Sequence, residues 1–245
     1  MRAALSAPAS GRDQPVDKRA GPALWRQTWH DLAFLHWPVP PALLRPLVPE
    51  PLAIDTFEGS AYVALTPFWM SGVTLRGLPA FPGLSTFPEL NVRTYVRLDD
   101  QPGVWFFSLD AGNRLAVGMA RRLFHLPYVH ARMRVGRLGA QLLYASRRRD
   151  GTSFVGSYEP AGPVIRYLPG TREHFLTERY RLYARSPAGN MYRAEIDHEP
   201  WPLQSARATL ERNDLLAAQG IAADGEPLVH YARRLDVKIW PLRAV

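Results

Sequence analysis

The strongest constraint on the fold is an alternation of apolar and polar side chains, which begins near Trp25 and continues almost to the end of the chain. A period of two is typical of β-strands, whose successive side chains point to opposite faces of a sheet. The 23 prolines and 18 glycines divide the pattern into short segments, as in antiparallel sheets joined by turns. The predicted strands are 32–37, 61–69, 90–98, 104–109, 128–135, 142–148, 152–158, 180–185, 192–197 and 230–240. The predicted fold class is therefore mainly β, a β-rich α+β fold with an antiparallel sheet.

Helices are predicted in only three places. Residues 40–47 form a short one, because proline is tolerated in a first helical turn. Asn113 caps a second helix over 114–123, in which Leu115, Met119 and Leu123 form an apolar stripe at helical spacing. A third helix is predicted over 211–219, because Gly220 provides a left-handed stop.

The first 24 residues differ in character from the rest. They are of low complexity and lack the apolar segment of about 7 to 15 residues that a secretory signal needs. We expect 1–24 to be a disordered leader. No internal repeat or later linker is visible, so 25–245 is predicted to be one domain.

The net charge of +8 raises the question of a nucleic-acid partner. Only Lys18 and Lys238 are lysines, so arginines make up nearly all of the basic residues and are spread along the chain. The densest run, 147–149, precedes Asp150 and Gly151 and looks like a hairpin turn, with no zinc-finger or RNA-binding pattern beside it. The distribution argues against nucleic acid.

Several other classes of site are disfavoured by what the sequence lacks. Without cysteine there are no disulfides and no thiolate ligands, which fits a cytoplasmic protein, and no apolar run approaches the roughly 18 residues of a membrane span. The seven histidines show no zinc-protease spacing, and neither a phosphate-binding loop nor a complete serine-nucleophile motif occurs. We therefore expect no metal and no cofactor.

The segment FPELNVRTYVRL, residues 87–98, carries the most informative pattern. Alternation places five polar or charged side chains on one face of the predicted strand: Glu89, Asn91, Arg93, Tyr95 and Arg97. Such a face could line an interior cavity of a closed sheet, or it could form exterior ion pairs with neighbouring strands. The residues alone leave both interpretations open.

A family resemblance favours the cavity. The segments PPALLRPLVPEPLAIDTFEGSAYVAL and ELNVRTYVRLDDQPGVWFFSLDAGNRLAVGMARRLFHLPY are similar to blocks of the acetoacetate decarboxylases. From Trp25 to Trp240, including FLHWPVP, LTPFWM, FLTERY and RAEIDHEPWPL, the chain more closely resembles a bacterial family of unassigned function in the acetoacetate decarboxylase-like superfamily. The resemblance implies a cone-like, barrel-forming β-sheet with an internal pocket walled by the polar face.

The resemblance also shows where the chain departs from the decarboxylases. Those enzymes use a lysine pair, one lysine forming a Schiff base with the ketone, and the corresponding positions here read Ala120, Arg121, Arg122 and Leu123. Arginine stays protonated and cannot form an imine. His30 falls where the family has an arginine for the substrate carboxylate. The chain is therefore not expected to be an acetoacetate decarboxylase.

The predicted function is binding of a small molecule, an organic anion, inside the sheet. Six residues are the candidates for this site: Arg122 and Arg93 as anion contacts, Glu89 and Asn91 as polar partners, and His36 and Tyr95 as lining residues. The alternative is an enzyme of the same superfamily, a lyase, hydrolase or isomerase that uses Glu89 or His36 as a general base. The oligomeric state is left open, and a homo-oligomer is compatible with the sequence.

The absence of lysine between Lys18 and Lys238 generates a direct test. Borohydride treatment in the presence of a β-keto acid should leave the protein mass unchanged, because no interior amine is available for an imine. Mass spectrometry provides the measurement. A ketone adduct that accompanies turnover would contradict the prediction.

Overall fold

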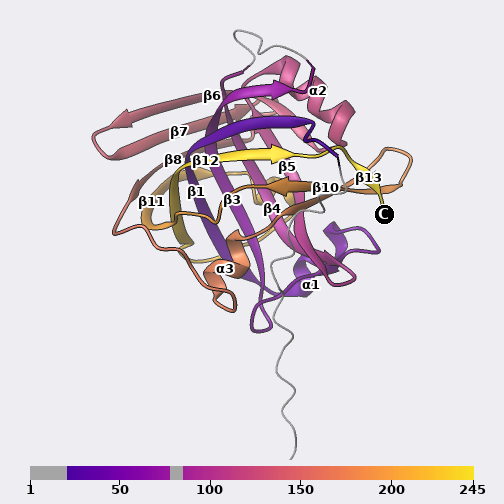
Figure 1. The fold of residues 1–245 in the computed structure, drawn as a ribbon. Coiled ribbons are helices and arrows are strands. Elements are labelled where there is room, and N and C mark those ends of the chain that lie inside the picture. The colour runs from indigo at the N-terminus through magenta and orange to yellow at the C-terminus, as the bar shows by residue number, and fades with distance from the viewer. Residues whose placement is uncertain (1–20, 78–84) are drawn as a thin grey trace, which may run out of the picture.

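The computed structural model describes residues 21–77 and 85–245. Its strands are β1 (Trp25–Val39), β2 (Ala53–Ile54), β3 (Ala61–Leu75), β4 (Phe87–Leu98), β5 (Gln101–Ala111), β6 (Tyr128–Leu138), β7 (Gln141–Arg148), β8 (Ser153–Pro160), β9 (Arg181–Arg185), β10 (Met191–Asp197), β11 (Gln204–Asn213), β12 (Leu228–Ile239) and β13 (Arg243–Ala244). The helices are α1 (Pro41–Leu44), α2 (Arg114–Phe124) and α3 (Arg172–Thr177), with single 3₁₀ turns η2 (Arg45–Leu47) and η3 (Ala217–Gln219) (Figure 1).

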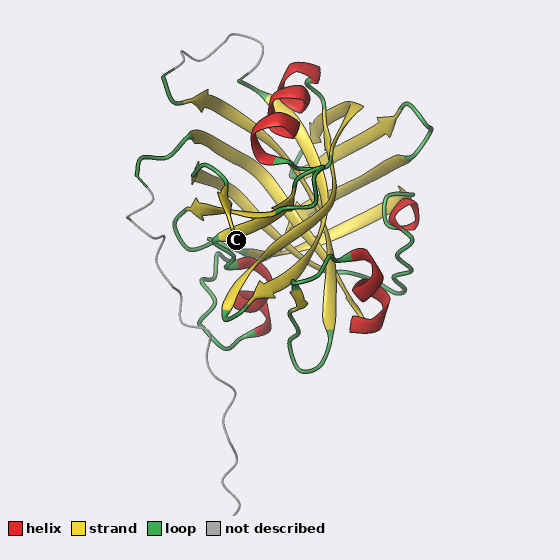
Figure 2. Cartoon of the chain, turned by 90° about the vertical axis from the view of Figure 1, so that its right-hand side faces the viewer, coloured by secondary structure: helices red, strands yellow, loops and turns green. Residues whose placement is uncertain are grey.

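The strands pair into one sheet that closes on itself. Its order is β13-β10-β9-β5-β6-β7-β8-β11-β12-β1-β3-β4-β2, and further pairings join β4 to β5 and β10 to β12. Because β4 pairs with both β3 and β5, the strands form a ring with an inner face. Figure 2 shows the long strands crossing through the centre with the helices at the periphery. The mainly-β prediction is confirmed.

Strand β4 is buried on both faces. Leu90 and Val92 belong to an apolar cluster with Leu142 and Tyr144 of β7, whereas Tyr95 belongs to the cluster that contains Trp25 and other inner side chains. Strand β4 therefore lies between two cores. Its polar residues cannot form the solvated exterior face that the sequence had left open.

The sequence located most strands but not all their bounds: β1 and β3 extend six or more residues beyond the predicted ranges, and β11 was not predicted. Each of the ten predicted strands overlaps an observed one, and most β-pairings are antiparallel, although β5 pairs in parallel with β6 and β9. The helix predicted over 211–219 is wrong, because the first part of that range is the end of β11 and only η3 is helical. Gly220 does adopt the expected left-handed conformation, with φ of 71°.

Helix α2 exists as predicted, with Asn113 accepting hydrogen bonds at its N-terminus from the backbone N–H groups of Leu115 and Ala116. Its buried face differs from the predicted one: it consists of Ala116, Val117, Ala120 and Phe124. Leu115 is 67% exposed, so the expected Leu115–Met119–Leu123 stripe does not face the core. The predicted stripe is therefore wrong, and the helix packs on the sheet through a neighbouring set of apolar residues.

Three further predictions from the sequence concern the leader, the number of domains and a membrane span. Residues 1–20 of the leader predicted over 1–24 lie outside the described residues. One domain over 25–245 remains a prediction. Within the part of the chain that is described, no helix combines the length and apolar character required to cross a membrane.

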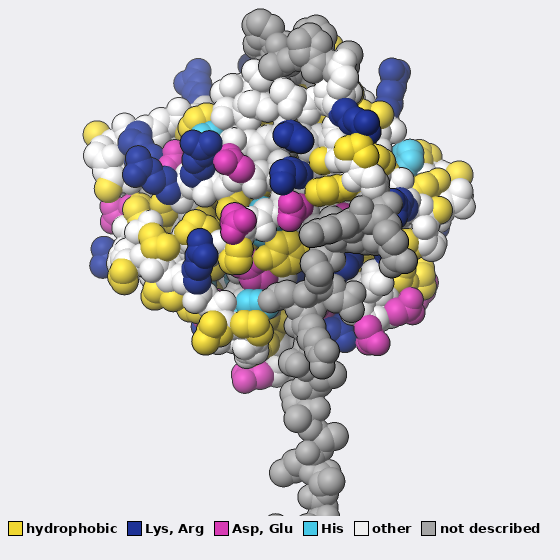
Figure 3. All heavy atoms as spheres, in the orientation of Figure 1, with side chains coloured by type: hydrophobic (Ala, Val, Ile, Leu, Met, Phe, Trp, Pro, Cys, Tyr) yellow, Lys and Arg dark blue, Asp and Glu magenta, His cyan; other side chains and the backbone are white. Residues whose placement is uncertain are grey.

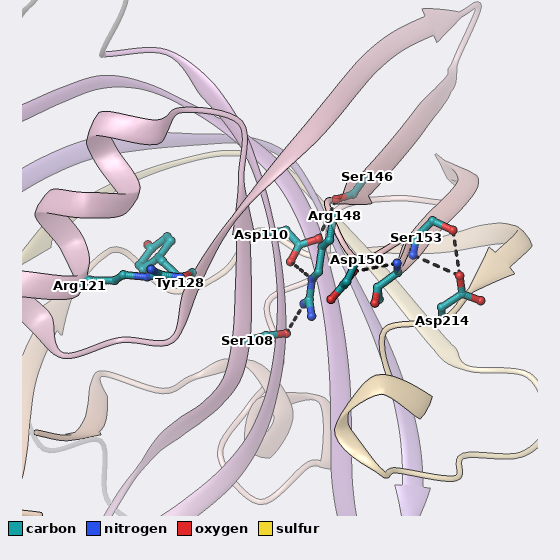
Figure 4. A network of polar contacts seen from close by, with 10 residues as sticks. Ser108, Asp110, Arg121, Tyr128, Ser146, Arg148, Asp150, Ser153 and Asp214 are labelled. Carbon is teal, nitrogen blue, oxygen red and sulfur yellow. Dashed lines mark hydrogen bonds and ion pairs between the residues drawn. The ribbon is translucent and has the colours of Figure 1, made fainter. Parts of the chain in front are cut away.

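A buried ion pair ties β5 to the hairpin of β6 and β7. Arg148 donates from Nε to Asp110 at 2.7 Å and from a terminal nitrogen to Ser108, while Ser146 donates to the other oxygen of Asp110 (Figure 4). The Asp110 side chain is fully buried. Burial raises its pKa despite the opposing effect of Arg148.

Removing one partner of this pair should be costly. Arg148→Ala should lower the free energy of unfolding by about 3 to 5 kcal/mol, because it leaves Asp110 buried without its cation. Arg147→Ala, at the exposed neighbouring position, should change it by less than about 0.5 kcal/mol. Urea denaturation measures both. Equal losses at the two positions would show that the buried ion pair contributes no more to the free energy of unfolding than an exposed arginine does.

Candidate functional site

The alternating polar residues of β4 form a continuous row inside the molecule. Glu89, Asn91, Arg93 and Tyr95 are all buried, with exposed fractions between 0% and 8%. Arg97, at the end of the row, is partly exposed and pairs with Asp55 at 3.3 Å. The sequence thus placed four candidate site residues on one buried face, and the structure brings them together there.

Glu89 is a buried carboxyl group whose pKa lies near neutral pH. The hydroxyl of Tyr128, at the start of β6, donates to its Oε2 at 2.8 Å. Burial raises the pKa of Glu89 to about 7, against the lowering effect of the hydrogen bonds from Tyr128 and Asn91. A carboxyl with such a pKa can both take up and release a proton at neutral pH, which is the property required of a general acid or base.

The surrounding backbone holds this pair in place. The Nε of Arg121 donates to the backbone carbonyl of Tyr128 at 2.6 Å (Figure 4). The hydroxyl of Tyr144 lies 2.7 Å from the backbone carbonyl of Glu89. Both contacts fix the main chain on either side of the Tyr128–Glu89 hydrogen bond, so its geometry is determined by the sheet.

Arg93 differs from the other buried arginines. Arg148, Arg179 and Arg181 each pair with a carboxylate, namely Asp110, Asp55 and Glu195. Among the described residues no carboxylate forms an ion pair with Arg93, and its Nε has no hydrogen-bond partner.

The guanidinium of Arg93 instead lies over two aromatic rings. It is 5.0 Å from the centre of the Phe34 ring and 5.9 Å from that of Tyr95. Cation–π contacts hold the group and leave its Nε donor without a hydrogen-bond partner.

Two tryptophans add further unused donors near Arg93. Trp29 of β1 and Trp201 stack with ring centres 5.8 Å apart, and Trp201 also packs edge-on against Phe34 at 4.9 Å. The indole Nε1 atoms of both tryptophans are buried without a hydrogen-bond partner. Arg93 and Trp201 both contact Phe34, and Trp29 stacks on Trp201, so three buried N–H donors lie within one set of aromatic contacts. Such a set complements an acceptor-rich group such as a carboxylate.

His36 lies at the far end of the row. Its Nε2 and the Tyr95 hydroxyl are 2.6 Å apart, and its ring stacks on Phe34. Burial, followed by the positive charge of Arg93, holds the pKa of His36 well below its usual value. The imidazole is therefore neutral at physiological pH and can accept or relay a proton.

Two hollows lie near residues that contact this row. A cavity of about 40 Å³ beneath α2 is lined by Gln27, Phe87 and Tyr128, and it has room for water but not for an organic ligand. A surface groove of about 430 Å³ between β1, β10 and β12 reaches His198. His198 is buried against Trp201, with ring centres 5.2 Å apart, so the groove comes close to the unpaired indoles.

Arg122, the remaining candidate, does not join the row. It lies on the exposed face of α2. Its predicted place as an anion contact inside the sheet does not fit this exposure, because the helix buries a different set of residues. His30 stacks on Trp69 at 3.9 Å and bonds to Ser71, outside the row. Within the described ranges, no group of three or more histidine or acidic side chains could hold a metal ion.

Sequence reasoning missed Tyr128, Trp29 and Trp201. Tyr128 lies at the start of a predicted strand, but nothing local identifies Glu89 as its partner across 39 residues. Trp29 could have been found, since alternation along β1 places it on the same face as Gln27 and Trp25. Trp201 lies in a segment without regular structure, where periodicity gives no signal.

The closed β-rich ring with its buried polar row defines a protein of the acetoacetate decarboxylase-like fold. The structure is similar to that of MppR, an enduracididine biosynthesis enzyme complexed with the condensation product of pyruvate and imidazole 4-carboxaldehyde. The TM-score is 0.69 at 13% identity, covering 91% of this chain and 90% of MppR. A structure of acetoacetate decarboxylase has a TM-score of 0.64 at 15% identity, covering 94% and 93%. At these identities the likeness establishes the fold.

The chain belongs to the DUF2071 family, described as an uncharacterized conserved protein, whose profile matches residues 26–236. The uncharacterized protein YqjF of Bacillus subtilis (strain 168) is 43% identical over 223 residues, which is 90% of this chain and 92% of YqjF. The predicted close match to a bacterial family of unassigned function, with only a remote match to the decarboxylases, is confirmed.

The raised pKa of Glu89 predicts a pH-dependent stability. Its folded-state pKa of about 7 lies above the ordinary 4.5, so the folded protein holds an extra proton between these values. The free energy of unfolding therefore falls as pH rises, by about 3 kcal/mol between about pH 5 and about pH 8 from this group alone. Glu89→Gln should remove that fall.

Urea denaturation of the wild type and the variant at the two pH values measures the difference. Glu211→Gln, at an exposed position on β11, is the control and should keep the wild-type pH dependence. A Glu89→Gln variant with unchanged pH dependence would show that the carboxyl does not titrate in this range.

Proposed function

We propose that this protein binds a small organic acid inside the ring, with the carboxylate held by Arg93 and the indole N–H groups of Trp29 and Trp201. The observation that carries the proposal is the difference between Arg93 and the three other buried arginines, each of which has a carboxylate partner. A buried, permanently charged group without an anion costs several kcal/mol. A ligand carboxylate would supply the missing charge.

The rest of the row suits the remainder of such a ligand. Residues two apart on a strand are separated by about 7 Å, so a molecule of a few carbons bound at Arg93 extends toward Asn91. Glu89, about 13 Å from Arg93 along the strand, is reached by a longer ligand. The aromatic rings of Phe34 and Trp201 provide apolar walls. The groove of about 430 Å³ at His198 opens beside Trp201 and provides the route to the site in this proposal.

Imine chemistry is not part of the proposal. Lys238 is half exposed on β12 and pairs with Asp197 at 3.4 Å, away from the polar row. MppR has been solved with pyruvate and with a pyruvate condensation product. This supports short oxo acids as the first ligands to test.

Calorimetric titration with short carboxylates, pyruvate among them, tests the proposal. Arg93→Lys should weaken binding by about 1 to 3 kcal/mol, because a lysine lacks the bidentate fork of arginine. Arg233→Lys, an exposed arginine of β12, should leave the affinity within about 0.5 kcal/mol. Urea denaturation confirms that both variants are folded.

Two outcomes would contradict the assignment. If no carboxylate binds the wild type at millimolar concentration, the organic-acid proposal fails. If Arg122→Lys loses as much affinity as Arg93→Lys, the anion contact lies on α2 and the site has been placed wrongly.

The second candidate function is catalysis by an enzyme without a Schiff base, and the near-neutral pKa of Glu89 favours it. In this reaction class, Glu89 would take a proton from the carbon next to a ligand carbonyl or give one to it, with Tyr128 donating to the carboxylate form. Binding requires Arg93 and not the ionisation of Glu89. Glu89→Gln therefore separates the two functions: it would abolish turnover and spare carboxylate affinity.

A further inference from the structure

The hairpin of β6 and β7 extends beyond the closed ring to a two-residue turn at Gly139 and Ala140 (Figure 1). Its outer half exposes apolar side chains: Val135 is 37%, Leu138 69% and Leu143 43% exposed. Apolar residues on a projecting element are surfaces that a partner can cover. None of the residues proposed for the organic-acid site lies in this outer half.

Among the described residues, one edge of β6 has no paired strand over most of its length. Tyr128–His130 pair with β5, and Ala131–Leu138 pair with β7 on the opposite side. In the described part of the chain no strand pairs with 131–138 on the side away from β7. Alternate backbone N–H and C=O groups of these residues therefore face outward, ready to pair with another strand.

The free edge carries positive charge. Arg132 and Arg134 are exposed and share the outer face of the hairpin with Arg147, which pairs with Arg132 across the strands. No ion pair joins any of these three arginines to a carboxylate among the described residues. The pKa of the nearby His130 is lowered, first by burial and then by the positive charges of Arg114 and Arg132.

An ion pair joins the tip of the hairpin to the ring. Arg137 donates to Asp31 at 2.8 Å, and Asp31 also accepts from the hydroxyl of Tyr231 at 2.5 Å. The Tyr158 hydroxyl bonds to the backbone carbonyl of Asp31 at 2.6 Å. The Arg137–Asp31 contact ties the hairpin to a residue that the ring itself holds, which lowers the ordering cost of presenting its edge.

We propose that the edge of β6, residues 131–138, binds an extended acidic segment of a partner protein as an added strand. The backbone of the segment pairs with β6, and carboxylates at alternate positions lie beside Arg132 and Arg134. An apolar residue further along the segment covers Leu138. The pattern recognised is thus two acidic residues separated by one residue, in a segment without proline.

Two other occupants fit the edge less well. A second copy of the chain would bring Arg132 and Arg134 close to the same arginines of its partner, and like charges on paired strands are destabilising. Nucleic acid offers phosphate oxygens, which only accept hydrogen bonds, whereas a strand edge presents donors and acceptors in alternation. Figure 3 shows basic side chains mixed with acidic and apolar ones on the visible face, with no continuous basic field.

A fluorescent ten-residue peptide of alternating glutamate and threonine is the probe, with binding followed by fluorescence anisotropy at near-physiological salt. Arg134→Glu should weaken binding at least about tenfold, because it replaces attraction by repulsion next to the added strand. Arg233→Glu changes the net charge equally at an exposed site on β12 and should change the affinity less than about twofold.

Backbone pairing is tested separately from charge. A peptide with proline in place of a central threonine should bind at least about tenfold more weakly, since proline cannot donate to a ladder. Hydrogen exchange should slow in the presence of the glutamate–threonine peptide at those amides of 131–138 that do not bond to β7.

Each contrary result overturns the proposal. Equal losses for Arg134→Glu and Arg233→Glu would reduce the effect to general charge attraction, and equal binding of the proline peptide would exclude strand addition. Absence of binding at about 1 mM peptide would exclude the site. Sedimentation showing a dimer that Arg134→Glu dissociates would assign the edge to a second copy, and a DNA oligonucleotide that binds more tightly, with the same loss in Arg134→Glu, would assign it to nucleic acid.

Discussion

The burial of β4 on both faces is the constraint from which the chemistry of the interior follows. A strand with one wet face could carry Glu89 and Arg93 at no cost, but here neither group reaches bulk water. Each must find a partner inside or change its ionisation. Glu89 does both, through Tyr128 and a raised pKa. Arginine cannot give up its proton, so Arg93 keeps a charge that aromatic faces only partly compensate.

Closure of the sheet explains why this strand is enclosed. Strand β4 lies between β3 and β5, so its backbone groups are paired on both edges, and a register shift between Val92 and Arg93 marks a local irregularity in its pairing with β5. Strand β1 brings Trp29, Phe34 and His36 to the same interior, although a bulge separates Trp29 from Phe34 in its pairing with β3. The row on β4 and the aromatic residues of β1 together form the inner wall, which neither strand could build alone.

Alternation was sufficient to predict the strands and the polar row, because period two in a β-strand is a local property that Glu89, Asn91, Arg93 and Tyr95 express directly. The buried face of helix α2 was harder to predict, because Leu115 and Ala116 are both apolar. Only the packing of the helix against the sheet determines that Ala116 is buried and Leu115 exposed. The last residues of β11 are compatible with either helix or strand, and their pairing with β8 determines that they form a strand. The unpaired indoles of Trp29 and Trp201 depend on contacts distant in sequence, so no local pattern reveals them.

The pairing of β1 with β12 has a consequence for the biogenesis of the protein. Trp25 lies opposite Ile239, so β1 is completed by a strand that is synthesised much later. Contacts of such long sequence separation form late and slowly, and during translation the inner face of β1 remains without its neighbour. The apolar residues of β1, Trp29 and Phe34 among them, are then exposed until the ribosome releases β12. The sheet order therefore leaves the aromatic side chains of β1 to be protected by other means until β12 has been synthesised.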